Sequence, residues 1–376
     1  MTVNILCTGD TQIGKAFGTL GASAGDFRNQ LFETFKRVMN DAKEYDLVLV
    51  AGDVFDREGT PTSLIEAAAD VFAACKTPTV VLAGNHDSLK SGIPQVLKAA
   101  LVRRKADHVF VPLQREPLPF PKLGLTVYPV PLLNKGDISN QYAWIPERST
   151  EDGLRVALMH GGLDTLPDGT IPADVASKKD LDLVVCGDQH GPSQGGEDAS
   201  VLFNGETSIK RRLVYSMAPE AQHINQGFVG AYTNVSLAEN GEIVALTRTE
   251  VGELRFLNST VTFNAETDLN LELEQALSPV ADRPPNLTSI RLTLVGELTS
   301  EGADLLDIEI AKLKSIWPLF EVFNQTTVVQ NGDDNTVQMD DPVLRTFLAK
   351  AHDVGLDDHI LKRAIEFYRI NKGRWV

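Results

Sequence analysis

Residues 47–56 read Leu-Val-Leu-Val-Ala-Gly-Asp-Val-Phe-Asp and join an apolar run directly to a polar cluster. A short run of Val and Leu bounded by glycine is typical of a buried strand. Asp53 and Asp56 follow directly after that strand. Polar side chains at the carboxyl ends of strands are where open α/β sheets build their sites. This stretch therefore predicts one strand of a layered α/β fold with acidic side chains at its end.

The same arrangement recurs four times in the first 190 residues, each time as an apolar run that ends in small residues and metal-capable side chains. Gly-Asp-x-x-Asp alone is a loose pattern that also occurs in turns, and a lone histidine after a strand is more typical of a core residue. Five such clusters in order indicate one shared site. The other four are Gly9-Asp10-Thr11-Gln12, Gly84-Asn85-His86-Asp87, His160-Gly161 and Gly187-Asp188-Gln189-His190.

Short apolar runs alternate with helix-period segments over these 190 residues, which predicts an α/β domain. After His190 the pattern changes to strands with turn residues. We interpret those strands as a second sheet packed on the first, giving a β-sandwich flanked by helices. Strands are expected at Val3–Cys7, Leu47–Ala51, Thr79–Ala83, Leu125–Pro129, Val156–Met159, Leu183–Cys186, Ser200–Phe203, Leu213–Ser216, Tyr232–Leu237 and Ile243–Thr249. Helices are expected at Phe27–Lys43 and Thr62–Cys75.

The chain is expected to divide into three parts. Residues 1–250 form the main domain, and a change of composition after Val251 begins a small α+β module at 251–330. Residues 331–376 form a polar linker and C-terminal helices, the first of which starts at Asp341-Pro342 with an acidic N-cap and a proline. Within the module, the expected elements are a helix at Leu269–Leu277, a strand at Ser289–Val295 and a helix at Ala303–Ile316.

The composition, 43% hydrophobic and 23% charged residues, is typical of a folded globular protein. No stretch approaches the roughly 18 consecutive apolar residues that a membrane span needs, so no membrane association is expected. The N-terminus lacks the basic region of a signal peptide. The three cysteines, Cys7, Cys75 and Cys186, lie inside apolar runs. These features predict a cytoplasmic protein without a disulfide framework.

The net charge of −16, from 51 acidic and 35 basic residues, opposes binding to nucleic acid. A DNA-binding function therefore needs a local basic strip or a basic partner. Lys210, Arg211 and Arg212 follow the last polar cluster closely enough to reach a substrate backbone. Such basic clusters are more often simply solvated surface.

Acidic and histidine side chains at these strand ends indicate a two-metal hydrolase. Two divalent ions roughly 3.5–4 Å apart need a bridging carboxylate with oxygen and nitrogen ligands on either side. Asp53 suits the bridge, since a carboxylate can give one oxygen to each ion. The flanking candidates are Asp10, Gln12, Asn85, His160, Asp188 and His190.

His86 and Asp56 are the candidate catalytic residues beside this metal site. His86 follows Asn85 directly and would face the substrate, as a general acid for the leaving oxygen or as a clamp on the phosphate. Asp56 and Asp87 are expected to cap or orient neighbouring groups rather than to bind metal, and either could hold His86 in place.

Together the five clusters resemble the ordered motifs of calcineurin-like metallophosphoesterases. Within that superfamily the chain is similar to the SbcD-type DNA-repair nucleases, because of Gly-Asp-Val-Phe-Asp at 52–56, Tyr-Ser-Met-Ala-Pro-Glu at 215–220 and the appended small module. The resemblance implies a four-layer α/β/β/α metallophosphoesterase sandwich with a small α+β capping domain. It also implies C-terminal helices that dock on an SbcC-type coiled-coil ATPase. The resemblance is strong to about residue 250 and rests on architecture beyond it.

The resemblance further implies two ligand sets that share Asp53. One is Asp10, Gln12, Asp53 and His190, and the other is Asp53, Asn85, His160 and Asp188. The family usually has histidine where Gln12 and Asp188 stand. An amide and a carboxylate make the site harder and richer in oxygen, which favours Mn²⁺, or Mg²⁺, over Zn²⁺.

The implied function is a manganese-dependent DNA phosphodiesterase, an exonuclease or endonuclease in which water activated by two metal ions attacks phosphorus. An SbcC-like ATPase would supply much of the DNA affinity and so answer the objection from charge. The chain itself has no Gly-x-x-x-x-Gly-Lys-Ser/Thr loop for ATP. A homodimer is compatible with the sequence, which does not decide the oligomeric state.

Two alternative functions stay open. The protein could be a catalytically weak metal-binding scaffold for DNA ends or a partner, in which Gln12 and Asp188 have ended turnover. It could also be a phosphodiesterase for small substrates. The capping module and the C-terminal segment argue against the latter, since a small-molecule hydrolase needs neither.

Overall fold

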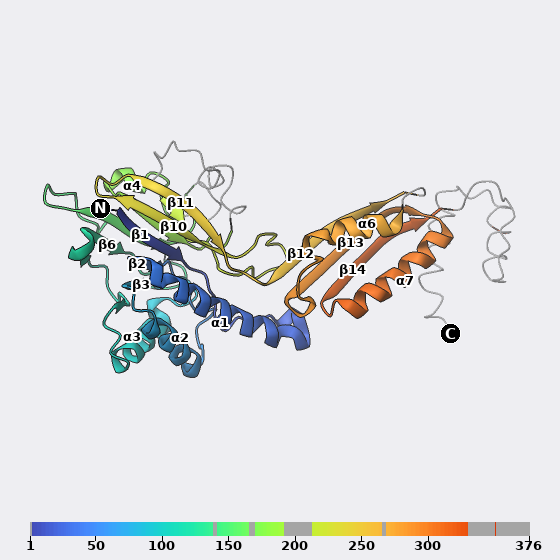
Figure 1. Ribbon diagram of the computed structural model, residues 1–376, viewed down its shortest axis with the longest axis horizontal. Coiled ribbons are helices and arrows are strands. Elements are labelled where there is room, and N and C mark those ends of the chain that lie inside the picture. The colour runs from blue at the N-terminus through green and yellow to red at the C-terminus, as the bar shows by residue number, and fades with distance from the viewer. Residues whose placement is uncertain are drawn as a thin grey trace.

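The computed structural model describes residues 2–137, 141–164, 170–191, 213–264, 268–329 and Lys350. Within these ranges the chain forms three sheets with helices on their faces (Figure 1). No helix in the described ranges is both long and apolar enough to cross a membrane. The cytoplasmic location stays a prediction.

The first sheet has six strands in the order β11-β10-β1-β2-β3-β4. The four strands from β1 to β4 are parallel, and β10 and β11 add an antiparallel hairpin beside β1. The strands are β1 (Thr2–Thr8), β2 (Leu47–Val50), β3 (Thr79–Val81), β4 (Val109–Phe110), β10 (Ala231–Ala238) and β11 (Ile243–Glu250).

The second sheet has five strands in the order β5-β6-β7-β8-β9. Its strands are parallel except for β5, which pairs antiparallel with β6. The strands are β5 (Leu118–Phe120), β6 (Leu125–Pro129), β7 (Leu154–His160), β8 (Leu183–Gly187) and β9 (Leu213–Tyr215).

The two sheets pack face to face, and β2 shows why its sequence is apolar throughout. Leu47 and Leu49 point into the core between the sheets, where they meet Val156 and Val185. Val48 and Val50 point the other way, into the core beneath the helices. A strand covered on both faces needs an unbroken apolar run rather than an alternating one.

Helices cover the outer faces and complete the four predicted layers. The first sheet is covered by α1 (Ala24–Asp41), α2 (Thr62–Ala74) and α3 (Ile93–Arg103). On the second sheet, α4 (Val175–Lys178) packs Val175 and Ala176 against the outer face. The predicted α/β/β/α fold class is therefore confirmed. Short 3₁₀ helices lie at Gly18–Ser23, Ala42–Glu44, Leu89–Ser91, Pro121–Leu123, Ser278–Val280 and Pro285–Leu287.

One prediction about the sheets is wrong. The strands after His190 do not form a second sheet of their own, because β10 and β11 extend the first sheet beside β1, and β9 joins the second. Most of the second sheet comes instead from residues 118–187. The register places Cys7 opposite Thr233, so the returning chain covers an edge that would otherwise be open. The strand predicted at Ser200–Phe203 lies outside the described residues.

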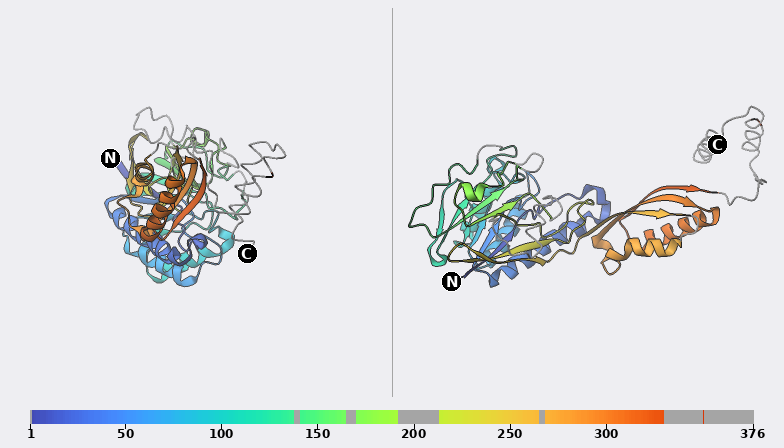
Figure 2. Two further views of the ribbon diagram at one scale, coloured as in Figure 1. Left: turned by 90° about the vertical axis from the view of Figure 1, so that its right-hand side faces the viewer. Right: turned by 90° about the horizontal axis from the view of Figure 1, so that it is seen from above.

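A third, smaller sheet of three parallel strands lies beyond the sandwich (Figures 1 and 2). It consists of β12 (Arg255–Phe263), β13 (Thr288–Leu298) and β14 (Phe320–Val328), with α6 (Leu269–Leu277) and α7 (Ser300–Ile316) on one face. The predicted helices and the strand of this module are present, while β12 and β14 were not predicted. Apart from Lys350, the residues of the helices expected in 331–376 lie outside the described residues.

Buried contacts connect α1 to the chain that leads into the third sheet. Phe27 of α1 packs edge-on against Phe256 of β12, with ring centroids 5.6 Å apart. Glu220, which is fully buried, accepts hydrogen bonds from the Thr34 hydroxyl at 2.6 Å and from the backbone of Glu253 and Leu254. This carboxylate therefore holds the chain against α1 at the point where it leaves the sandwich.

Candidate metal centre

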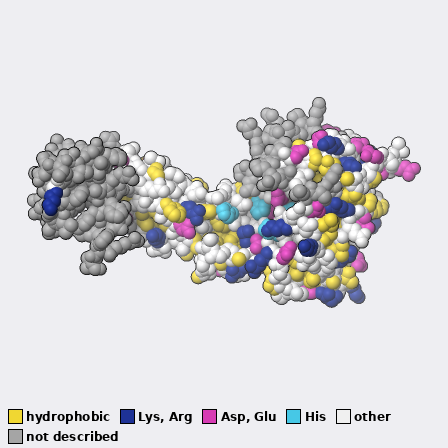
Figure 3. Space-filling model, turned by 180° about the vertical axis from the view of Figure 1, so that it is seen from behind, with side chains coloured by type: hydrophobic (Ala, Val, Ile, Leu, Met, Phe, Trp, Pro, Cys, Tyr) yellow, Lys and Arg dark blue, Asp and Glu magenta, His cyan; other side chains and the backbone are white. Residues whose placement is uncertain are grey.

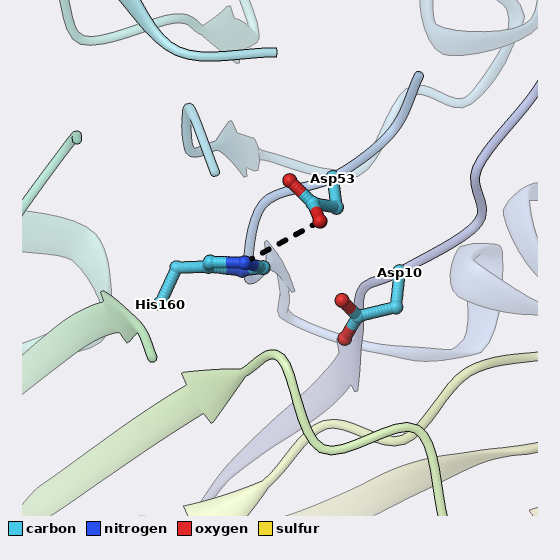
Figure 4. Close-up of side chains that lie close together, drawn as sticks. All are labelled: Asp10, Asp53 and His160. Carbon is cyan, nitrogen blue, oxygen red and sulfur yellow. Dashed lines mark ion pairs between the residues drawn. The ribbon is translucent and has the colours of Figure 1, made fainter. Parts of the chain in front are cut away.

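Five strand ends meet at one edge of the sandwich, from β1, β2 and β3 of the first sheet and β7 and β8 of the second. Figure 4 shows Asp10, Asp53 and His160 pointing toward one another there. One potential ligand atom from each lies within 4.8 Å of the others, and all three residues are buried. This geometry indicates a metal centre between the two sheets.

His160 has a free ligand atom directed into this cluster. Its Nδ1 lies 2.7 Å from the carbonyl oxygen of Ala51. A carbonyl can only accept, so Nδ1 carries the proton and Nε2 keeps its lone pair. Nε2 lies 3.5 Å from Asp53 Oδ2 and 3.9 Å from Asp188 Oδ1. It is buried and has no hydrogen-bond partner among the described residues.

Asn85 presents a second atom of this kind. Its amide nitrogen lies 3.4 Å from Asp188 Oδ1, while its Oδ1 is buried and has no partner within the described part of the chain. Buried polar atoms are nearly always satisfied, so two unpartnered acceptors beside two carboxylates indicate a positive ligand. Asp53, Asn85, His160 and Asp188, hereafter the His160 half, fit a divalent cation.

Asp10, Gln12, Asp53 and His190, hereafter the His190 half, lie on the other side of Asp53. Asp10 is fully buried, and its two oxygens accept from the backbone N–H of Asp188 at 3.2 and 3.0 Å. His190 Nε2 lies 3.7 Å from Asp10 Oδ1. The structure therefore brings all seven predicted ligands to one place.

Two residues that were not predicted occupy this second half. Lys15 donates to Gln12 Oε1 at 2.7 Å and to Asp56 Oδ1 at 3.2 Å. The Gln226 amide nitrogen lies 3.0 Å from His190 Nδ1. The oxygen expected to bind metal is thus the one that Lys15 contacts.

Burial and charge act together on the ionisable groups. Burial raises the pKa of Asp10 well above its usual value. The nearby His160 lowers this pKa, and the negative charges of Asp53 and Asp188 raise it further. Burial lowers the pKa of His160, but the carboxylates of Asp53, Asp10 and Asp188 outweigh it and raise that pKa well above the usual range. The cluster is thus short of positive charge, which a cation supplies.

The same physical forces act differently on His190. Burial lowers its pKa to about 4, with Lys15 contributing in the same direction. His190 is therefore neutral near pH 7, whereas His160 attracts a proton.

His86 stands at the open side of the cluster, with its side chain 31% exposed. Its backbone N–H donates to Asp53 Oδ1 at 2.8 Å, and its Nδ1 contacts the carbonyl oxygen of Asp56. Nε2 lies 4.0 Å from Asp53 Oδ2 and is the ring atom left to meet a substrate. Histidine side chains are visible at the surface in Figure 3.

The carboxylates of Asp56 and Asp87 have other roles than holding His86. Asp56 orients the ring through its backbone oxygen, while its side chain accepts from Lys15. Asp87 accepts from the backbone N–H of Gly84 at 2.8 Å and of Phe55 at 3.1 Å. Asp87 therefore connects the loop after β3 to the loop after β2.

The backbone of these loops is unusual. Asp10, Gln12, Asp53 and Asp188 have φ angles of 50°, 45°, 52° and 85°, and they make up half of the eight non-glycine residues with positive φ in the described ranges. Side chains seldom adopt this region, and such strain gathers at functional sites. Gly84 belongs to the same packing, because a Cβ there would collide with Asp53.

Of the remaining predicted site residues, Lys210, Arg211 and Arg212 lie outside the described residues. Lys15 stands three positions after Gln12, a spacing that sequence reasoning could have used. Gln226 gave no such signal, because it reaches His190 from 36 positions along the chain.

Comparison with known proteins agrees with this geometry. A sequence model of the family described as calcineurin-like phosphoesterase matches residues 3–192. No curated protein sequence matches the chain. Similar solved structures include the protein TT1561 of Thermus thermophilus, at 12% identity and a TM-score of 0.41. A second has 10% identity and a TM-score of 0.42, and both alignments cover 67% of this chain and 100% of the other.

Proposed function

Because the chain belongs to the calcineurin-like phosphoesterase family, we propose that it is a metal-dependent phosphodiesterase that cleaves DNA. Family membership implies hydrolysis of phosphoesters. The choice of DNA, and of an SbcD-type nuclease subunit in particular, rests on the resemblance of the motifs at 52–56 and 215–220 and on the module that follows the sandwich.

The observation that carries the chemistry is the pair of unpartnered acceptors, His160 Nε2 and Asn85 Oδ1, beside the carboxylate of Asp53 in the described part of the chain. A divalent cation held there would act as a Lewis acid and make water nucleophilic near neutral pH. The oxygen-rich ligand set favours Mn²⁺ or Mg²⁺.

His86 would supply the proton for the leaving oxygen or hold the phosphate. The Asp56 carbonyl fixes its Nδ1, so Nε2 faces the open side of the site. The ring thus has one orientation, which a general acid requires.

The net charge of −16 opposes DNA binding, and a basic partner would compensate for it. We propose that an SbcC-like ATPase supplies much of the DNA affinity. Residues 331–376 of this chain would form the segment that docks on that ATPase. Phosphate contacts provide most of the non-specific affinity for DNA, so an acidic nuclease subunit gains from a partner that makes them.

A non-catalytic scaffold for DNA ends is the second candidate, and one observation favours it. Gln12 Oε1 accepts from Lys15 at 2.7 Å, so one of the predicted ligands is already engaged. A site with fewer ligands could bind metal but hydrolyse phosphodiesters slowly.

Cleavage of linear single- and double-stranded DNA with Mn²⁺ or Mg²⁺ tests the proposal, with wild type compared with His86→Ala. We expect wild type to degrade DNA and the variant to lose about 100-fold or more of that activity, the usual contribution of general acid catalysis. Lys76→Met, at an exposed residue that donates to a helix carbonyl, is the control.

The negative results separate the alternatives. Metal binding without cleavage, even after an SbcC-like ATPase is added, would support the scaffold. Turnover of mononucleotide esters but not of polynucleotides would indicate a small-substrate phosphodiesterase.

A further inference from the structure

We infer that the site holds one divalent ion tightly, in the His160 half, and that Lys15 and Gln226 keep a second ion from binding well in the His190 half. The inference rests on the proposed function only for the presence of a divalent ion. It departs from the two bound ions that the resemblance implies.

The side chain of Gln12 turns its oxygen toward Lys15. A lysine ammonium has three donors and no acceptor, so the Gln12 atom 2.7 Å from Lys15 Nζ must be the oxygen. The amide nitrogen then faces His190. Gln12 therefore presents N–H groups, which cannot coordinate a cation, to the place where its oxygen was expected.

Gln226 sets the tautomer of His190. Gln226 Oε1 accepts from the backbone N–H of Gln222 at 2.7 Å, which directs the Gln226 amide nitrogen to His190 Nδ1 at 3.0 Å. Because that nitrogen donates, Nδ1 accepts, and the proton of the neutral ring lies on Nε2. His190 therefore presents an N–H to the site, toward Asp10 Oδ1 at 3.7 Å.

The contact between Gln12 and His190 competes with this assignment, but it is the longer of the two contacts to the ring. Their facing nitrogens are 3.4 Å apart, at the long limit of a hydrogen bond. A neutral imidazole cannot accept at both nitrogens, and the shorter bond, from Gln226, takes the one acceptor.

Lys15 also acts through its positive charge. Its side chain is 25% exposed, and its ammonium lies between Gln12 and Asp56, beside the His190 half. A fixed positive charge there repels a second cation. To bind a metal ion, Gln12 Oε1 would also have to give up its hydrogen bond with this ammonium. Asp10 and the shared Asp53 then remain as the ready ligands of this half.

The experiment counts the Mn²⁺ bound per full-length chain by equilibrium dialysis, after removal of metal, in wild type and in variants. Gln226→Glu keeps the shape but adds a carboxylate that would accept from His190 Nδ1 and free the lone pair of Nε2. Lys15→Met removes the ammonium. Gln275→Glu on α6 and Lys76→Met make the same charge changes at exposed positions.

We expect one tightly bound ion in wild type and in both controls. Gln226→Glu should raise the affinity for a second ion about tenfold, and the double variant with Lys15→Met about 100-fold, giving two ions per chain. Two equivalent ions in wild type, no bound ion, or one ion in all variants would each overturn the inference.

Histidine ¹⁵N chemical shifts of the metal-free wild type provide a readout that needs no variant to fold. They should show the proton of the neutral His190 ring on Nε2, and a proton on Nδ1 instead would overturn the inference. Neither measurement involves DNA cleavage. Failure of the inference and failure of the proposed function are therefore distinguishable.

Discussion

The two halves of the metal centre contain the same kinds of side chain but present them in opposite ways. His160 Nδ1 faces a carbonyl acceptor, so its lone pair at Nε2 points into the site, whereas His190 Nδ1 faces the amide donor of Gln226. Within the described residues, Asn85 leaves its oxygen unpartnered, whereas the oxygen of Gln12 accepts from Lys15. The groups behind a ligand therefore decide whether its lone pair is available to a metal ion.

Asp53 belongs to both halves, and changing it should have the largest effect. Asp53→Asn removes the negative charge that faces His160 Nε2 at 3.5 Å. We expect loss of tight Mn²⁺ binding and a decrease of about 1000-fold in phosphodiester cleavage, since a catalytic metal contributes several kcal/mol. Dialysis with Mn²⁺ and a cleavage assay measure the two effects. Unchanged Mn²⁺ binding would mean that the metal lies elsewhere.

A matched pair of histidine variants tests the difference between the halves directly. His160→Asn removes the available lone pair and should weaken Mn²⁺ binding about 100-fold. His190→Asn should change the first binding constant by less than about threefold, because its Nε2 carries a proton. Isothermal titration with Mn²⁺ measures both constants. Equal losses in the two variants would mean that the halves are equivalent.

The smallest expected effect concerns stability rather than metal binding. Asp87 accepts two backbone N–H groups that connect the loops of the His160 half. In Asp87→Asn, one of these N–H groups would face an amide donor, which costs about 1–3 kcal/mol. The melting temperature of the metal-free protein measures this cost. Asp107→Asn, at an exposed position, is the control and should leave it unchanged. A melting temperature equal to wild type in Asp87→Asn would refute this role.

Sequence reasoning located the strand ends because the signal there is local. Each of β1, β2, β3, β7 and β8 is a short apolar run followed directly by its polar cluster. Since parallel strands place their carboxyl ends at one edge of a sheet, the approximate position of the site followed.

Sheet membership was harder to predict, because it depends on contacts between distant segments. The alternation in Tyr232–Leu237 predicted a strand but not its pairing with β1. β14 was missed because residues such as Glu321, Asn324 and Gln325 leave it largely exposed and without a clear apolar pattern.

The orientation of side chains within the site could not be predicted from the sequence, because it too depends on contacts between distant residues. Residue type predicted that Gln12 and His190 could bind metal. Only the positions of Lys15 and Gln226 show which atom of each side chain faces the site.

Anomalous diffraction from crystals of the full chain grown with Mn²⁺ tests the difference between the halves most directly. A single strong peak bounded by Asp53, Asn85, His160 and Asp188 is the predicted result. Two peaks of similar occupancy, or one peak beside Asp10 and His190, would contradict it.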